Sequence, residues 1–411
     1  MIGFRRVAVI DGTGAAPVPD RWVVVDDGRI TASGPEPLPD SHPAAADRVT
    51  QIDGSGHTLL PGLINCHVHL CNDGSADTVR QVRDDSVPMA TLRAVKNLGV
   101  ALGAGVTTVR DCGAADEVAI ELARAVADGI VAGPRILAAG RVITMTGGHG
   151  HFIGREADGP DAVRQATRAE LKAGADFIKA MATGGVLTPG VEPDHSGLAE
   201  DELRWVVRTA HAAGRRTASH AIGGAGIKNA LRAGIDSIEH GFHLDDEALE
   251  LAVGNGAFLV PTLVAIESIT ANAGRPELPD WVIRKAETES GAHRAGFAAA
   301  VAAGVTIAAG TDAGTPFNPH GDLARELGLM VDYGMTPMQA IVAATANAAR
   351  NLDLHDKVGT IEPGKEADLI LVPGDPSADI GRLGQVALVM KHGQVLHDTR
   401  HDTTHDTLHR D

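Results

Sequence analysis

Cysteine is scarce in this chain of 411 residues, which contains only Cys66, Cys71 and Cys112. An odd number of cysteines without Cys-x-x-Cys spacing favours neither a disulfide framework nor a zinc site built from thiolates. We therefore expect these cysteines to be reduced and mostly buried.

Aromatic and basic residues are also few. The chain has 3 Trp, 1 Tyr and 7 Phe, and its 36 Lys and Arg are outnumbered by 53 Asp and Glu, which gives a net charge of −17. Nucleic-acid partners are excluded on this ground, because their binding sites need positive charge and stacking rings.

Long hydrophobic runs are lacking as well. Residues 1–14 contain no apolar signal-peptide core, and the run from Phe297 to Gly310 is too short and too rich in Ala and Gly to span a bilayer. We expect a cytoplasmic protein without a membrane partner.

The two ends of the chain share one pattern. The first 60 residues contain short strand-like segments separated by turns, and the pattern returns after Gly364. We expect residues 1–60 and 365–398 to form one small β-sandwich from both termini. The expected strands are Arg6–Ile10, Trp22–Val25, Arg29–Ala32, Val49–Ile52, His57–Leu60, Ala367–Val372, Val386–Lys391 and Gln394–His397.

Residues 61–364 follow a different pattern, in which short apolar segments alternate with Ala-rich amphipathic ones. This alternation is typical of βα units and a parallel sheet. Eight strands are expected, the number that closes a (β/α)8 TIM barrel, so the predicted fold class is α/β. The strands are Leu63–His69, Val106–Arg110, Arg135–Ala138, Phe177–Met181, Thr217–His220, Asp236–His240, Phe258–Val260 and Thr306–Ala309.

The last fifteen residues repeat His-Asp-Thr with a period of four. Such a polar tract cannot build a core. We predict a disordered tail over residues 399–411 and assign it no function.

A histidine pair stands at the end of the first barrel strand, in Asn65-Cys66-His67-Val68-His69. Side chains two residues apart on a strand share a face, so His67 and His69 are expected to point together into the barrel mouth. Two neutral imidazoles in this arrangement can chelate zinc, although a lone pair is also compatible with chance packing.

Four more strand ends carry residues that can bind metal, namely Lys179, His220, His240 and Asp312. All belong to the C-terminal rim, where barrel active sites lie, whereas core histidines would occur at scattered depths. We therefore predict a metal site. Imidazole and carboxylate ligands suit zinc, the default, but also cobalt, manganese or iron.

The segment from Pro61 to His69, with the downstream Lys, His, His and Asp, resembles the amidohydrolase superfamily. Further motifs resemble its imidazolonepropionase-like branch, which contains prolidase-type and ochratoxinase-type metallohydrolases. These motifs are Gly147–Gly150, Lys179–Gly185, Ser237–Gly241 and Gly359–Leu369. The resemblance extends over about residues 5–397.

The resemblance implies two divalent metal ions. His67, His69 and Asp312 would bind one ion and His220 and His240 the other, with carboxylated Lys179 bridging both. A buried lysine resists protonation, because desolvation disfavours its charged form, and the neutral amine can add carbon dioxide to give a carbamate. The implied reaction is hydrolysis of an amide C–N bond, in which Asp312 accepts a proton from the attacking hydroxide and passes it to the leaving nitrogen.

The rim loops supply further candidates. Glycines flank His149, so it could approach a substrate and donate a hydrogen bond to its carbonyl or carboxylate; the alternative is a loop histidine bonded to backbone, which is favoured for His151. Thr183-Gly184-Gly185 could line the site with backbone amides or form a plain turn. Arg141, Arg155 and His149 are the candidates for neutralising a substrate carboxylate.

Arg110, Asp111 and Glu239 are expected to have structural rather than catalytic roles. Arg110 and Asp111 are predicted to form an ion pair beneath the rim. Glu239 precedes His240 on a strand, so it should point away from the metals and support the site from behind.

The leading hypothesis is a binuclear amidohydrolase acting on a small peptide-like or N-acyl substrate. The alternatives are a mononuclear deaminase or cyclic amide or imidazolone ring hydrolase on the same barrel, which has no use for a carboxylated lysine, and a non-catalytic metal-binding protein. Besides a small-molecule substrate, a second copy of the chain is a candidate partner, which would make the protein a homo-oligomer.

Overall fold

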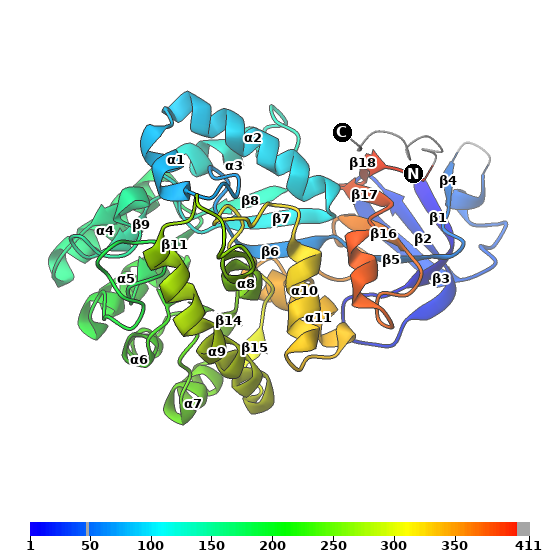
Figure 1. The fold of residues 1–411 in the computed structure, drawn as a ribbon. Coiled ribbons are helices and arrows are strands. Elements are labelled where there is room, and N and C mark those ends of the chain that lie inside the picture. Colours follow the sequence, from blue (N-terminus) through cyan, green and yellow to red (C-terminus); the bar gives the residue numbers. More distant parts are fainter. Residues whose placement is uncertain (47–48, 401–411) are drawn as a thin grey trace.

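The computed structural model of the chain describes residues 1–46 and 49–400. Strands from both chain ends lie side by side, next to a larger α/β body surrounded by helices (Figure 1).

The α/β body contains all eight strands predicted between residues 61 and 364, and every pairing among them is parallel. The prediction of an α/β fold with parallel sheets is therefore confirmed. The strands are β6 (Leu63–Val68), β7 (Val106–Asp111), β8 (Arg135–Ala138), β11 (Phe177–Met181), β12 (Arg216–Ala221), β13 (Ser237–His240), β14 (Phe258–Val260) and β15 (Thr306–Ile307).

These strands belong to two sheets. One has the order β6-β7-β8, and the other has the order β10-β9-β11-β12-β13-β14-β15. The sequence analysis missed β9 (Val142–Thr144) and β10 (Gly154–Glu156). Each has only three residues, which is too short for an alternating pattern to be visible.

Backbone hydrogen bonds link the two sheets at both edges. Next to β8, the Asp176 amide donates to the Ala138 carbonyl at 2.8 Å. Next to β6, the Asp312 amide donates to the His67 carbonyl and the His69 amide to the Ala313 carbonyl, both at 2.8 Å. The carboxyl end of β6 therefore lies directly beside the segment that follows β15.

Helices follow the strands and cover them with apolar faces. On α5, for example, Leu203, Val206, Val207 and Ala210 are buried at helical spacing. The helices are α1 (Thr78–Asp84), α2 (Val87–Gly103), α3 (Val118–Ala127), α4 (Pro160–Ala173), α5 (Glu200–Ala212), α6 (Gly224–Ala233), α7 (Asp246–Asn255), α8 (Leu263–Ala271), α9 (Asp280–Ala303), α10 (Leu323–Asp332), α11 (Pro337–Ala343) and α12 (Ala346–Asn351), with 3-10 turns η1 (Pro43–Ala45), η2 (His151–Ile153) and η3 (Ile380–Gly384).

Both chain ends form one eight-stranded sheet. The strands are β1 (Ile2–Val9), β2 (Val18–Asp26), β3 (Arg29–Pro35), β4 (Thr50–Asp53), β5 (His57–Pro61), β16 (Leu369–Pro373), β17 (Leu388–Lys391) and β18 (Gln394–Asp398). The order is β18-β17-β16-β5-β1-β2-β3, and β4 also pairs with β1. The expected pairing of the two ends is present, whereas two stacked layers and the domain limits stay predictions.

Three smaller expectations can be compared with the structure. Cys66, Cys71 and Cys112 are free and buried, as predicted. Among the described residues, none of the helices is long and apolar enough to cross a membrane. Of the predicted disordered tail, Thr399 donates its amide to the Ala387 carbonyl at 2.9 Å, and residues 401–411 lie outside the described part of the chain.

Candidate metal centre

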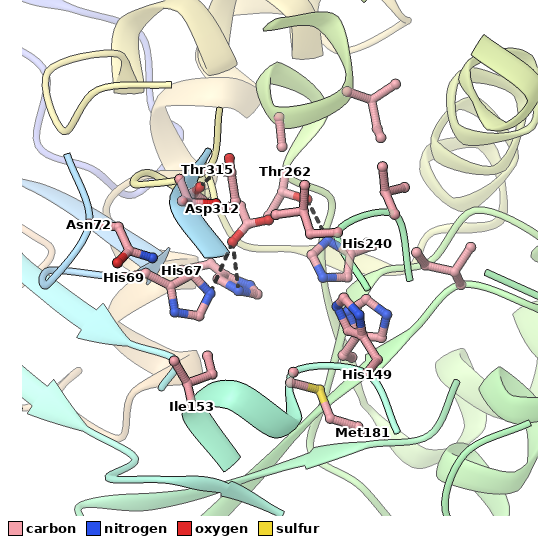
Figure 2. A pocket seen from close by; sticks show the side chains of 18 of the residues that line it. His67, His69, Asn72, His149, Ile153, Met181, His240, Thr262, Asp312 and Thr315 are labelled. Carbon is pink, nitrogen blue, oxygen red and sulfur yellow. Dashed lines mark hydrogen bonds and ion pairs between the residues drawn. The ribbon is translucent and has the colours of Figure 1, made fainter. Parts of the chain in front are cut away.

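The structure brings all six predicted metal ligands to one cavity at the carboxyl ends of the strands, and His149 lines it too (Figure 2). The space not filled by atoms amounts to about 810 Å³, including the part open to solvent. The predicted residues that meet there are His67, His69, His149, Lys179, His220, His240 and Asp312.

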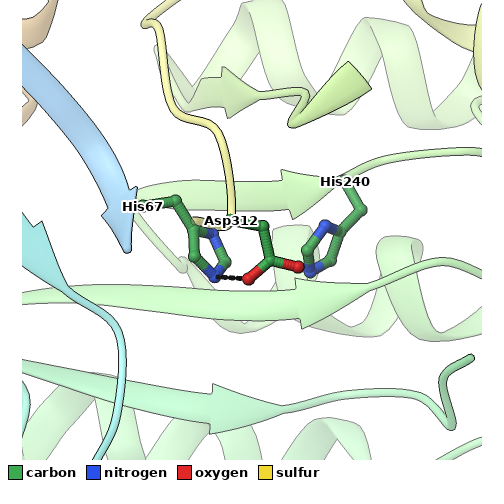
Figure 3. A group of neighbouring side chains, drawn as sticks. All are labelled: His67, His240 and Asp312. Atoms are coloured by element: carbon green, nitrogen blue, oxygen red, sulfur yellow. Dashed lines mark ion pairs between the residues drawn. The ribbon is translucent and has the colours of Figure 1, made fainter. Parts of the chain in front are cut away.

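Asp312 stands beside the histidine pair of the first strand. Its Oδ1 atom lies 3.3 Å from His67 Nε2 and 3.2 Å from His69 Nε2. His67, His240 and Asp312 point toward one another, and one donor atom from each lies within 4.8 Å of the other two (Figure 3). Imidazole and carboxylate donors at this separation could hold a divalent metal ion.

Two of these residues have unusual backbone conformations. His240 has a φ of 73° and Asp312 a φ of 58°, both in the left-handed region. This region costs a residue with a Cβ roughly 1–2 kcal/mol. Such strain persists only where the surroundings impose it, and it often occurs at functional sites. Here it accompanies the turn of both side chains into the cavity.

Each of the four imidazoles uses one ring nitrogen to bond the protein. Carbonyl and carboxylate oxygens can only accept, so the partners of His67, His69 and His220 fix a proton on the bonded nitrogen. Thr262 donates its hydroxyl to the Pro261 carbonyl at 2.7 Å and therefore accepts from His240. The bonds are His67 Nδ1 to Glu239 Oε2 at 2.7 Å, His69 Nδ1 to the Gly113 carbonyl at 2.8 Å, His220 Nε2 to the Gly184 carbonyl at 2.7 Å and His240 Nδ1 to Thr262 Oγ1 at 2.7 Å.

In the neutral form of each ring, the opposite nitrogen then keeps its lone pair. This is the arrangement of metal-binding histidines, in which the second ring nitrogen donates to an acceptor that orients the ring.

The charge states of His67, His220, His240 and Asp312 fit the same use. Burial lowers the pKa of His67 to about 4, and it lowers the pKa values of His220 and His240 well below the ordinary value. Burial acts against the charged form of His69 too, but the hydrogen bond to Asp312 raises its pKa. The pKa of Asp312 is lowered despite its burial, because His67 and His69 lie beside it. Neutral imidazoles and an ionised carboxylate are the forms that bind metal.

Lys179 lies on β11 with only 1% of its surface exposed. Its Nζ atom has no hydrogen bond or ion pair with any described residue, although it lines the cavity.

Glu239 supports the site from behind, as the strand pattern predicts. It is not among the residues that line the cavity, and its Oε2 atom bonds His67 Nδ1, the ring nitrogen opposite the one that faces Asp312, at 2.7 Å. His240 leaves the strand in a left-handed conformation, so the two neighbours approach the site from different sides. Burial alone would raise the pKa of Glu239, but the Arg110 charge holds it at about 2.

The predicted pair of Arg110 with Asp111 is wrong. Arg110 Nη2 bonds Glu239 Oε1 at 2.6 Å, while Asp111 accepts from the amides of Leu70 and Gly113. Adjacent residues on β7 face opposite sides of the sheet, so Arg110 and Asp111 cannot easily meet.

His149 is held by loops. Its Nδ1 atom lies 2.8 Å from Thr188 Oγ1, and burial lowers its pKa to about 3. Lys285 of α9 fixes the loop that carries Thr188 by donating to the carbonyls of Gly185, Thr188 and Val191 at 3.2, 2.9 and 2.6 Å. No sequence pattern indicated a role for Lys285, since it lies about a hundred residues from its partners.

His151 is exposed, and its Nδ1 atom lies 3.1 Å from the Gly148 carbonyl, in keeping with a loop histidine. The two candidate arginines do not reach the cavity. Arg141 pairs with Asp116, and Arg155 pairs with Glu170 at 2.7 Å.

An α/β fold that brings four imidazoles, a lysine and an aspartate together at its strand ends is typical of metal-dependent hydrolases. The chain belongs to the amidohydrolase family, whose model matches residues 58–396. It is therefore a hydrolase that acts on carbon–nitrogen bonds.

Individual relatives agree with this assignment. The chain is 32% identical over 367 residues to ochratoxinase from Aspergillus niger, a match that covers 81% of this chain and 74% of that one. It is 28% identical over 408 residues to imidazolonepropionase from Rhizorhabdus wittichii, covering 89% and 91%. A solved Xaa-Pro dipeptidase with bound methionine in its active site has a TM-score of 0.88 and 34% identity, covering 96% of this chain and 99% of that one.

Proposed function

We propose that the chain is a binuclear amidohydrolase that cleaves the C–N bond of a small amide, with two divalent ions, zinc by default, bridged by a carbamate on Lys179. The observation that carries this proposal is the orientation of four imidazoles, each bonded to the protein through one nitrogen, so that the neutral ring can offer the other nitrogen to a metal ion. One ion would be held by His67, His69 and Asp312, and the second by His220 and His240.

We also propose that the two parallel sheets form one closed (β/α)8 barrel. The hydrogen bonds at both sheet edges support this, since Asp176 reaches Ala138 on one side and Asp312 reaches His67 on the other. Closure would set the ligands from distant strands around one axis.

Lys179 suits the bridging role by its burial and because its Nζ atom makes no hydrogen bond or ion pair with any described residue. Adding carbon dioxide to the neutral amine forms an N–C bond and releases one proton, which gives an anion with two oxygens. Two divalent ions bound to such a bridge would polarise the scissile carbonyl and lower the pKa of water to about 7.

Asp312 is the proton carrier in this proposal. It is ionised, so it can take the proton of the attacking water and return it to the leaving nitrogen as the C–N bond breaks. The acyl carbon gains the hydroxyl group and the nitrogen gains the proton. His149 is neutral; the ring nitrogen opposite the Thr188 bond could donate to the substrate oxygen as negative charge develops there.

A second candidate is a mononuclear deaminase or ring hydrolase on the same scaffold. One observation favours it: His67, His240 and Asp312 bring their donor atoms within 4.8 Å of one another, which suffices for a single ion. Lys179 would then have no bridging role.

Metal analysis separates the two. Protein reconstituted with zinc and bicarbonate should bind two ions per chain and hydrolyse members of an amide panel. Lys179→Met should lose at least one ion and the activity, while Lys172→Met, at an exposed position of α4, should change neither. One ion per chain with full activity in Lys179→Met would support the mononuclear candidate instead.

A further inference from the structure

The cavity has one wall without polar groups. Val186, Ile222, Phe242, Ile266 and Ile269 line it and are all buried, and they belong to one hydrophobic cluster that continues onto α9. In this cluster, Ile222 directly follows β12, Ile266 and Ile269 belong to α8, and Val186 lies in the loop at residues 186–187. An apolar group of a substrate would find matching contacts here.

Cationic side chains are scarce in the same cavity. Among the described residues that line it, Lys179 is the only lysine or arginine. Lys285 stands behind the wall, but its ammonium is already bonded to three carbonyls. Arg141 and Arg155 are engaged by Asp116 and Glu170 and do not line the cavity.

Phenol donors are missing too. The only tyrosine of the chain, Tyr333, donates to Glu267 at 2.8 Å and does not line the cavity. A carboxylate placed against this wall, away from the metal ligands, would lose its hydration and gain no cationic side chain or phenol in return, which is unfavourable.

We infer that the enzyme prefers neutral amides that carry an apolar group and no free carboxylate, so that N-acyl amines are better substrates than the corresponding N-acyl amino acids. This inference rests on the proposed function, because it describes the substrate of that same site.

The direct test compares two amides that differ only by the carboxylate, N-benzoyl-2-phenylethylamine and N-benzoyl-L-phenylalanine. With the zinc-loaded full chain, kcat/KM should be at least about tenfold higher for the neutral amide. Equal values, or a preference for the acid, would overturn the inference and leave the proposed hydrolysis intact.

A variant pair sharpens the test. Leu187 is partly exposed at the cavity rim, so Leu187→Arg adds a cation next to the apolar wall. This variant should gain activity on the acid and lose part of the preference, whereas Leu187→Met should keep it. No change in preference in Leu187→Arg would count against the wall as its source.

A binding measurement keeps the two proposals separate. Calorimetry with the metal-loaded Asp312→Asn variant should show about tenfold tighter binding of the neutral amide. If neither amide is cleaved by the wild type and the whole amide panel is inert, the proposed function fails, and the binding ratio still decides the ligand class.

Discussion

His67 and His149 line the same cavity, but the protein holds them by different means. His67 lies on β6 and bonds Glu239 of β13, which in turn bonds Arg110 of β7, and all three side chains are at most 3% exposed. His149 lies on a loop between two glycines in the left-handed region, Gly147 and Gly150, and depends on Thr188 of a second loop.

We call the first set, His67, Glu239 and Arg110, the strand wall, and the second set, His149, Thr188, Gly185 and Lys285, the loop wall. Three strands fix the strand wall through buried charges, so it provides a precise position for a metal ligand. The loop wall depends on neutral hydrogen bonds and one lysine, and it can change without disturbing the sheets. This difference predicts that metal binding and substrate handling can be damaged separately.

The largest effect is expected at Asp312, whose Oδ1 atom contacts the strand wall and which also carries the proton in the proposed reaction. Asp312→Asn keeps the shape of the side chain but cannot accept the proton, so kcat should fall by about 10²–10⁴. Metal content by mass spectrometry should be retained in part. Near-normal kcat at full metal loading would refute the role of Asp312.

The second prediction concerns a substitution that removes the Glu239 carboxylate from the strand wall. Glu239→Gln leaves the Arg110 charge buried without its counter-ion, which typically costs about 3–5 kcal/mol of unfolding free energy. His67 also loses its charged acceptor, so metal affinity should fall by about 10–100-fold. Denaturant unfolding and metal titration measure both effects, with Glu250→Gln, an exposed position on α7, as the control. An unchanged metal affinity would mean that Glu239 does not orient His67.

Acidification should remove the contribution of the Arg110–Glu239 ion pair to the stability of the fold. The pKa of Glu239 is about 2 in the folded chain, against an ordinary 4.5, because Arg110 outweighs the effect of burial. A lowered carboxyl pKa stabilises the fold above pH of about 4.5, and this contribution is lost as the pH falls toward about 2. In metal-free protein, the stability difference between wild type and Glu239→Gln should therefore shrink with acidification, by on the order of 3 kcal/mol. A constant difference across this range would contradict the assignment.

The smallest effect is expected from the loop wall. A Cβ atom at Gly185 would lie 2.5 Å from the His149 ring, too close for the ring to keep its place. Gly185→Ala should therefore displace His149 and lower kcat/KM by about tenfold to a hundredfold, with metal content and melting temperature near those of the wild type. Gly254→Ala, where a Cβ meets nothing within 4 Å, is the matched control. Loss of metal in Gly185→Ala would contradict the prediction that the loop wall can be changed without affecting metal binding.

The same distinction explains what the sequence could predict. Strand ends carry the six candidate ligands, and buried parallel strands are visible as short apolar runs, so both could be located from the pattern alone. The supporting place of Glu239 followed from strand alternation, but its pairing with Arg110 could not be predicted, because the two residues lie on different strands and 129 positions apart. Thr188, Thr262 and Lys285 act through contacts between distant loops and helices, for which a linear pattern has no period.

The pairing of β5 with β16 has a consequence for synthesis of the chain. Leu60 of β5 pairs with Ile370 of β16. Because β16 is synthesised near the end of translation, β5 cannot form this pairing until most of the chain has been made. Until then, apolar residues such as Leu59 and Leu60 lack their final neighbour and present an open strand edge. Nascent or truncated chains that stop short of Leu369 should therefore depend on chaperones and aggregate more readily than the finished protein.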